Sequence, residues 1–149
     1  MISRFDVAAV QESRRNPKAL KRLLGTLGPR WQVIVSDVTE GAAGNGERLA
    51  FLYDTDRVQP SGLVGEIVLP PVGEDPARQF ARTPYTASFT RAGVEFTLAS
   101  VHILWGKNLA ERLPEITEFA AWMHDWAVRP LDWNSNLIVP GGLQPGPDR

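Results

Sequence analysis

The sequence contains no cysteine, which excludes disulfide bonds and metal sites built from thiolates. No apolar run approaches the roughly 20 residues that a membrane-spanning helix needs. Residues 1–12 also lack the basic-then-apolar order of a signal peptide. We therefore expect no membrane segment, and a cytoplasmic location is the default expectation.

The chain also has little excess charge of either sign, with a formal net charge of -1. This balance argues against a broad basic surface for nucleic-acid backbones, although it leaves room for a local phosphate site. With 149 residues, 43% hydrophobic and 22% charged, the composition is that of an ordinary globular protein. One domain with one core is the simplest expectation for this length.

The order of apolar segments predicts an α/β fold, a mixed β-sheet with flanking helices. The stretch 48–53 is apolar at consecutive positions, which predicts burial on both faces of the sheet. Arg91, Ala92 and Gly93 supply the turn of an expected hairpin. The predicted strands are residues 6–10, 31–38, 48–53, 66–69, 85–90, 94–103 and 136–139.

Helix start signals occur at two places. Asn16 and Pro17 are a typical N-cap and first helical residue, and Gly28 is typical of a helix end. For the second helix we expect a start at Pro114, at its own first position. The alternative is that Asn108 caps a short helical turn, with Glu111 completing a capping box.

Glu12 and His102 follow apolar segments, where functional side chains often lie. A carboxylate such as Glu12 can bind a hard divalent cation that keeps several waters and takes its other ligands from a substrate phosphate. His102 can act as a general acid or base near neutral pH. The alternatives are a solvated strand end for Glu12 and a structural hydrogen-bonding role for His102.

Glu47 and Arg82 are two further candidates. Glu47 precedes the expected strand 48–53 and could orient a histidine by accepting its ring N–H. Arg82 precedes Pro84 at the entry to the hairpin and could hold a phosphate with two parallel hydrogen bonds. The alternatives are a surface carboxylate paired with Arg48 and an ordinary exposed loop arginine.

Four ordered motifs give these candidates a common context. They are Asp6-Val-Ala-Ala-Val-Gln-Glu12; Glu47-Arg-Leu-Ala-Phe-Leu-Tyr-Asp54; Phe80-Ala-Arg-Thr-Pro84 with the hairpin after it and the strand that ends at His102; and Asn136-Leu-Ile-Val139. Together they resemble the motifs of the endonuclease/exonuclease/phosphatase superfamily, the deoxyribonuclease-like metal-dependent phosphoesterases. The resemblance covers about residues 5–142.

The resemblance implies a hydrolase of phosphodiester or phosphomonoester bonds that depends on Mg²⁺ or Mn²⁺, with a phosphoester substrate that includes nucleic acid among the candidates. It implies that Glu12 is a metal ligand and that Arg82 contacts phosphate. It also implies that His102 hydrogen-bonds the phosphate or transfers a proton, with Glu47 as its orienting carboxylate. The fold it implies is about half of a four-layer α/β sandwich.

The chain departs from the family pattern near both ends. The strand expected before the Gln-Glu motif is missing, as is a later Ser-Asp-His-like motif. Pro140-Gly-Gly-Leu-Gln144 stands where Gly-Asp-Phe-Asn is expected. Deleting one G from the codons GGC GGA CTT CAA CCN gives codons for Gly-Asp-Phe-Asn. We therefore interpret residues 1–139 as a partial domain and residues 140–149 as an irregular tail that a frameshift would explain.

These departures lead to two expectations. We expect the chain to be catalytically incomplete, the alternative being a non-catalytic remnant that binds a phosphorylated ligand or a protein partner. We also expect both helices to cover one face of a single sheet, because the second sheet of the sandwich is expected to be largely missing.

Overall fold

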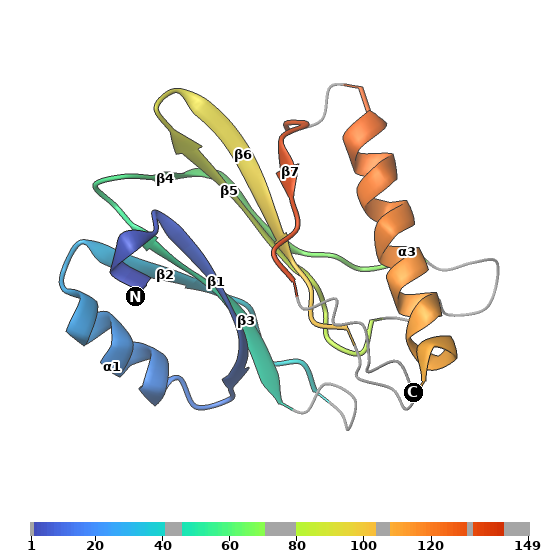
Figure 1. The fold of residues 1–149 in the computed structure, drawn as a ribbon, viewed down its shortest axis with the longest axis horizontal. Coiled ribbons are helices and arrows are strands. Elements are labelled where there is room, and N and C mark those ends of the chain that lie inside the picture. Colours follow the sequence, from blue (N-terminus) through green and yellow to red (C-terminus); the bar gives the residue numbers. More distant parts are fainter. Residues whose placement is uncertain (1, 41–45, 71–79, 104–107, 131–132, 142–149) are drawn as a thin grey trace.

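The computed structural model describes residues 2–40, 46–70, 80–103, 108–130 and 133–141 (Figure 1). Strands β1, β3 and β2 form one antiparallel sheet in that order. The other sheet has the order β4-β5-β6-β7, with β7 parallel to β6. The predicted mixed α/β fold is confirmed. The elements are a 3-10 turn at Ile2–Arg4, β1 Val7–Arg14, α1 Lys18–Leu27, β2 Trp31–Val35, β3 Glu47–Asp54, β4 Gln59–Glu66, β5 Tyr85–Arg91, β6 Val94–Ser100, α3 Leu109–Val128 and β7 Leu137–Ile138.

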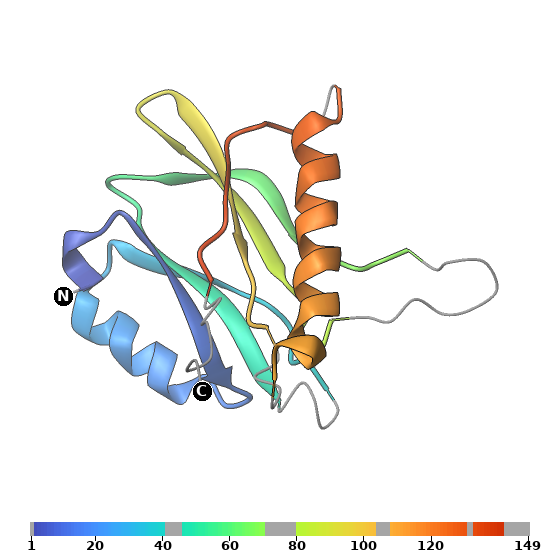
Figure 2. The same cartoon turned by 45° about the vertical axis from the view of Figure 1, so that its right-hand side comes forward.

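The layers follow from the alternation of side chains along β3. Phe51 points toward the second sheet and packs in a core that includes Phe89. Its neighbour Leu52 points the other way, into a cluster with Leu20 of α1. On the far side of the second sheet, α3 packs through Phe119. The order of layers is therefore helix, sheet, sheet, helix, and Figures 1 and 2 show α1 and α3 on opposite sides of the molecule.

This arrangement corrects the expectation that both helices cover one face of a single sheet. Each helix covers the outer face of a different sheet, and the inner faces of the sheets pack on each other. The expected strand at residues 66–69 is also misplaced, because β4 spans Gln59–Glu66. This strand brings the chain from the first sheet into the second, so the described residues include strands of both sheets.

The start of α3 decides between the two sequence-based alternatives. Asn108 is the N-cap, and its side-chain oxygen accepts a hydrogen bond from the backbone N–H of Glu111 at 3.1 Å. Asn108 is a cap as the alternative expected, but it caps the whole of α3 and not a short turn. The prediction that the helix begins at Pro114 is wrong because Pro114 lies inside it. No helix in the described part of the chain is long and apolar enough to cross a membrane.

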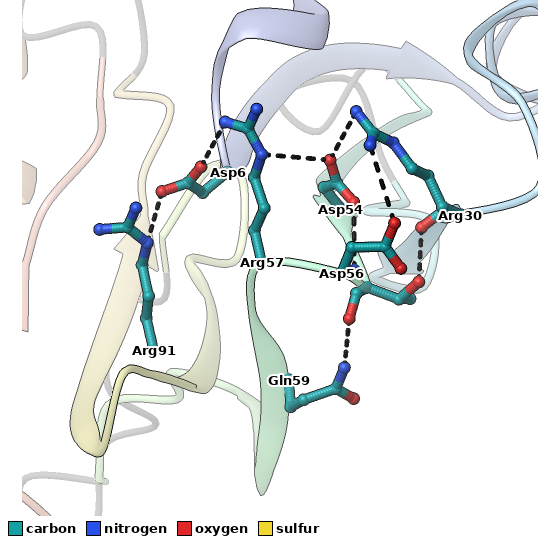
Figure 3. Close-up of polar contacts among 8 residues, drawn as sticks. Asp6, Arg30, Asp54, Asp56, Arg57, Gln59 and Arg91 are labelled. Carbon is teal, nitrogen blue, oxygen red and sulfur yellow. Dashed lines mark hydrogen bonds and ion pairs between the residues drawn. The ribbon is translucent and has the colours of Figure 1, made fainter.

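A network of aspartates and arginines joins the two sheets at one end of the sandwich (Figure 3). The fully buried carboxylate of Asp54 lies 3.1 Å from Nη2 of Arg30 and 3.5 Å from Nε of Arg57. Asp6 lies 2.9 Å from Arg57 and 2.7 Å from Nε of Arg91. Because Asp6 precedes β1 and Arg91 ends β5, these ion pairs tie the first sheet to the second.

The inner core also contains an ionisable group, the phenol of Tyr85, which is 5% exposed. Burial, and secondarily the carboxylate of Glu66, raise its pKa above the ordinary value of 10.0. Above pH 10.0 the unfolded chain therefore loses this proton more readily than the folded one, and the free energy of unfolding should fall as pH rises. Urea unfolding on both sides of that pH should show a smaller fall for Tyr85→Phe. An identical pH dependence in both proteins would contradict this prediction.

Candidate functional site

The first residue of β3, Glu47, is buried and lies at the centre of a polar cluster. Its carboxylate accepts hydrogen bonds from Arg82, at 2.7 Å from Nε and 3.3 Å from Nη2. It also lies 3.0 Å from Nδ1 of His102. An ionised carboxylate has no hydrogen to donate, so an ionised Glu47 requires the tautomer of His102 in which Nδ1 is the donor. The alternative in which Glu47 pairs with Arg48 on the surface is wrong. Arg48 instead donates to the backbone oxygen of Ser36 at 2.7 Å.

Glu12 approaches the same histidine from β1. Glu12 was expected after the end of a strand, but β1 continues to Arg14. The pairing of β1 with β3 shifts register between Val10 and Ser13. Glu12 occupies this bulge with φ 57, an uncommon value for a residue with a side chain. Bulges re-aim side chains, and here Oε1 of Glu12 lies 3.6 Å from Nε2 of His102.

The two segments that carry Glu12 and His102 are joined next to the site. The side-chain amide of Gln11 donates a hydrogen bond to the backbone oxygen of Val101 at 2.7 Å. Because Gln11 precedes Glu12 and Val101 precedes His102, this hydrogen bond holds the two site residues near each other. A polar residue that followed a predicted strand in the sequence thus has a structural role in the folded protein.

An open pocket of about 500 Å³ lies beside this cluster, lined among the described residues by Glu12, Arg14, Arg15, Gly46 and Glu47. Arg15 forms two hydrogen bonds to Glu40, at 2.8 and 2.9 Å. Neither arginine was among the residues selected from the sequence, where the signal for them is their position just after Gln11, Glu12 and Ser13. The pocket therefore presents both acidic and basic groups to whatever enters it.

All four side chains selected from the sequence thus lie in one cluster, but their chemical roles stay predictions. Arg82 differs most from its expected role, because two of its guanidinium nitrogens bond to Glu47. Its third terminal group, Nη1, is buried and has no hydrogen-bond partner among the described residues. Glu47 engages one hydrogen on Nε and one on Nη2, so the edge formed by Nη1 and Nη2 keeps hydrogens for two parallel bonds to a phosphate. Because Nη1 is buried, such a contact requires a local movement that exposes it.

The side chains of the cluster offer few ligands to a resident metal ion. The described residues contain no group of three or more His, Asp or Glu side chains that could hold a metal ion by themselves. Glu12 is 72% exposed at the pocket, so it offers one open carboxylate. One carboxylate fits an ion such as Mg²⁺, which keeps several waters and takes further ligands from a substrate phosphate. It does not fit a cation enclosed entirely by protein.

Comparison with known proteins gives matches of both sequence and fold. No family model matches the chain. A curated protein named deoxyribonuclease, from Thioalkalivibrio sp. (strain K90mix), is 33% identical over 130 residues, which cover 83% of this chain and 34% of that protein. The chain therefore spans about a third of this relative's length.

Solved structures with the same fold come from distant proteins. A mannosyl-6-phosphatase of Bacteroides thetaiotaomicron is similar with a TM-score of 0.64 and 20% identity, over 93% of this chain and 51% of that one. The human Nocturnin catalytic domain matches with a TM-score of 0.62 and 16% identity, over 93% and 51%. An endonuclease/exonuclease/phosphatase family protein of Bacteroides thetaiotaomicron matches with 0.63 and 20%, over 92% and 49%. The chain therefore has the fold of the endonuclease/exonuclease/phosphatase proteins and spans about half of their length.

Proposed function

We propose that this chain is part of a metal-dependent phosphoesterase that hydrolyses phosphodiester or phosphomonoester bonds. The observation that carries the proposal is the geometry around His102. Its Nδ1 is held by the buried Glu47 at 3.0 Å, and its Nε2 lies 3.6 Å from the exposed carboxylate of Glu12. Glu12 and Glu47 both line the pocket.

Each side chain has a defined part in this proposal. Glu47 accepts the Nδ1 hydrogen, which leaves Nε2 of His102 to exchange a proton or to hydrogen-bond a phosphate oxygen. Glu12 would hold Mg²⁺ or Mn²⁺, and such an ion offsets the charge that develops on a phosphate. Arg82 would contact the phosphate through the Nη1 and Nη2 hydrogens that Glu47 does not engage, after a local movement that exposes the buried Nη1.

The names of the similar proteins support a phosphoester substrate without selecting one. One relative is named as a deoxyribonuclease, and one structural neighbour as a sugar phosphatase. Nucleic acid is therefore one proposed substrate class. The net charge of -1 favours recognition through a local phosphate site over a broad basic surface.

The second candidate is a domain that binds a phosphorylated ligand or a protein partner without hydrolysing it. One sequence feature favours it, because Pro140 and Gly141 occur shortly after β7, where the family pattern has Gly-Asp-Phe-Asn. Pro140 and Gly141 have no side chain that could ligate a metal or position water. Under this candidate, Arg82 and His102 would bind a phosphate that stays intact.

A hydrolysis assay separates the two candidates. With bis(4-nitrophenyl) phosphate and Mg²⁺ or Mn²⁺, the first predicts metal-dependent release of nitrophenol. Glu12→Gln should reduce this release by roughly 100-fold or more, since even the outer-shell partners of metal ligands are worth 10–100-fold. The matched control is Glu118→Gln, which changes an exposed carboxylate on α3 and should leave the rate unchanged.

The same proteins also test the second candidate. Binding of inorganic phosphate, measured by calorimetry with and without Mg²⁺, should weaken in His102→Ala if the site binds without turnover. Hydrolysis that is lost in Glu12→Gln supports the first candidate. Phosphate binding without hydrolysis supports the second. Both are contradicted if neither property differs between the site variants and Glu118→Gln.

A further inference from the structure

The contacts of Arg82 differ from those expected of an arginine whose only role is to bind a phosphate. Its side chain is 12% exposed, and both of its side-chain hydrogen bonds to other described residues go to Glu47. One of the two oxygens, Oε2, also faces Nδ1 of His102. Arg82, Glu47 and His102 therefore form a continuous chain of polar contacts with the carboxylate in the middle.

The carboxylate needs this arginine for a physical reason. Glu47 is 8% exposed, and a buried charge is costly unless it is paired and hydrogen-bonded. A planar guanidinium that reaches both oxygens fixes the orientation of the carboxylate as well as balancing its charge. With that orientation fixed, Oε2 is held where it accepts a hydrogen from His102.

Both ends of the chain of contacts are anchored to the fold. Beside Arg82, the backbone N–H of Ala81 donates to Glu115 of α3 at 2.8 Å, and the ring of Phe80 packs on Phe119. Beside His102, Gln11 bonds to the backbone oxygen of Val101. Arg82 is therefore positioned by α3 and His102 by β1, and Glu47 connects them.

We propose that Arg82 is a positioning residue for His102 and acts through Glu47. It holds the carboxylate so that the neutral imidazole carries its hydrogen on Nδ1 and leaves Nε2 open toward Glu12. This role is additional to any phosphate contact through Nη1 and Nη2. A contribution of this role to catalysis rests on the proposed phosphoesterase function. The effect on the tautomer of His102 does not require a substrate.

The tautomer of His102 tests this proposal directly. The chain has two histidines, so His124→Gln assigns the signals of His102 in ¹⁵N NMR spectra recorded through the carbon-bound ring hydrogens. At a pH where histidine is neutral, the unmodified protein should show the tautomer with hydrogen on Nδ1. Arg82→Lys keeps the charge but not the two-bond geometry, and it should shift the ring nitrogens toward a mixture of tautomers. Arg91→Lys changes an arginine that is ion-paired with Asp6 at the opposite end of the sandwich, and it should leave the His102 ring-nitrogen signals unchanged.

The outcomes separate a positioning role from a phosphate contact. If Arg82→Lys weakens binding of inorganic phosphate while the His102 nitrogens stay as they were, the positioning role is overturned. If Arg82→Lys does not fold, Glu47→Gln provides the test, and the Arg82 Nε–H and His102 Nδ1 signals should both move. An unmoved Arg82 signal would overturn the proposal. None of these NMR measurements depends on turnover. If the unmodified protein hydrolyses no phosphoester but Arg82→Lys still shifts the His102 ring nitrogens, only the proposed function is contradicted.

Discussion

Replacing Phe51 with alanine should lower the free energy of unfolding by about 3–5 kcal/mol, the usual cost of truncating a buried phenylalanine. Phe51 is fully buried between the sheets, with its ring centre 5.9 Å from that of Tyr85 and 6.2 Å from that of Phe89. Alanine would remove these contacts and leave a cavity where both sheets meet. The expected effect is this large because the two sheets pack on each other. Truncating a ring on an open sheet face would lower the free energy of unfolding much less.

The matched control is Phe5→Ala, which removes the same ring from a position that is 55% exposed. Its expected effect is within about 0.5 kcal/mol, as for most surface substitutions. Urea unfolding of both variants and the parent gives the comparison. Equal destabilisation by the two substitutions, or less by Phe51→Ala, would mean that the sheets do not share the core described above.

The strand β3 shows how far the sequence predicts this fold. Consecutive apolar residues correctly predicted burial on both faces, but they could not tell which layer covers each face. A hydrophobic pattern records that a side chain is buried, not which element buries it. Leu52 contacts α1 and Phe51 contacts the second sheet, and only the path of the chain decides this. The hydrophobic pattern therefore predicts the strand correctly but not the layer in which each helix lies.

The main error in the predicted path of the chain lies at β4. Pro60, Gly62 and Gly65 interrupt this strand, and such residues normally argue against a strand interior. The pairing with β5 in fact shifts register between Pro60 and Val64, which is where an irregular strand tolerates them. Since β4 leads from the first sheet into the second, missing it removed the second sheet from the prediction.

The candidate site shows a similar division between what the sequence predicts and what the fold decides. Motif resemblance selected Glu12, Glu47, Arg82 and His102, and the fold brings them together. The pairing of Arg82 with Glu47 was not predicted, because the two are far apart in the sequence and the match to a motif carries no information on partners. The bulge that turns Glu12 toward His102 was equally invisible, since no glycine or proline marks it.

The pairing of Glu47 with Arg82 leads to a second large effect. Glu47→Leu should lower the free energy of unfolding by about 3–5 kcal/mol, because removing one partner of a buried ion pair leaves the other charge uncompensated. Arg82 is 12% exposed, so water can solvate little of its guanidinium once the carboxylate is gone. The exposed control Glu118→Leu should change stability by no more than about 0.5 kcal/mol.

A double variant shows whether this loss comes from the lone charge or from damaged packing. Glu47→Leu with Arg82→Met contains no buried ion pair and no unpaired guanidinium, and apolar replacements of such pairs are often neutral or stabilising. We therefore expect the double variant to unfold at higher urea concentration than Glu47→Leu alone, in a double-mutant cycle completed by Arg82→Met. If the two single losses simply add, Glu47 and Arg82 are not coupled, and Arg82 could not position His102 through the carboxylate.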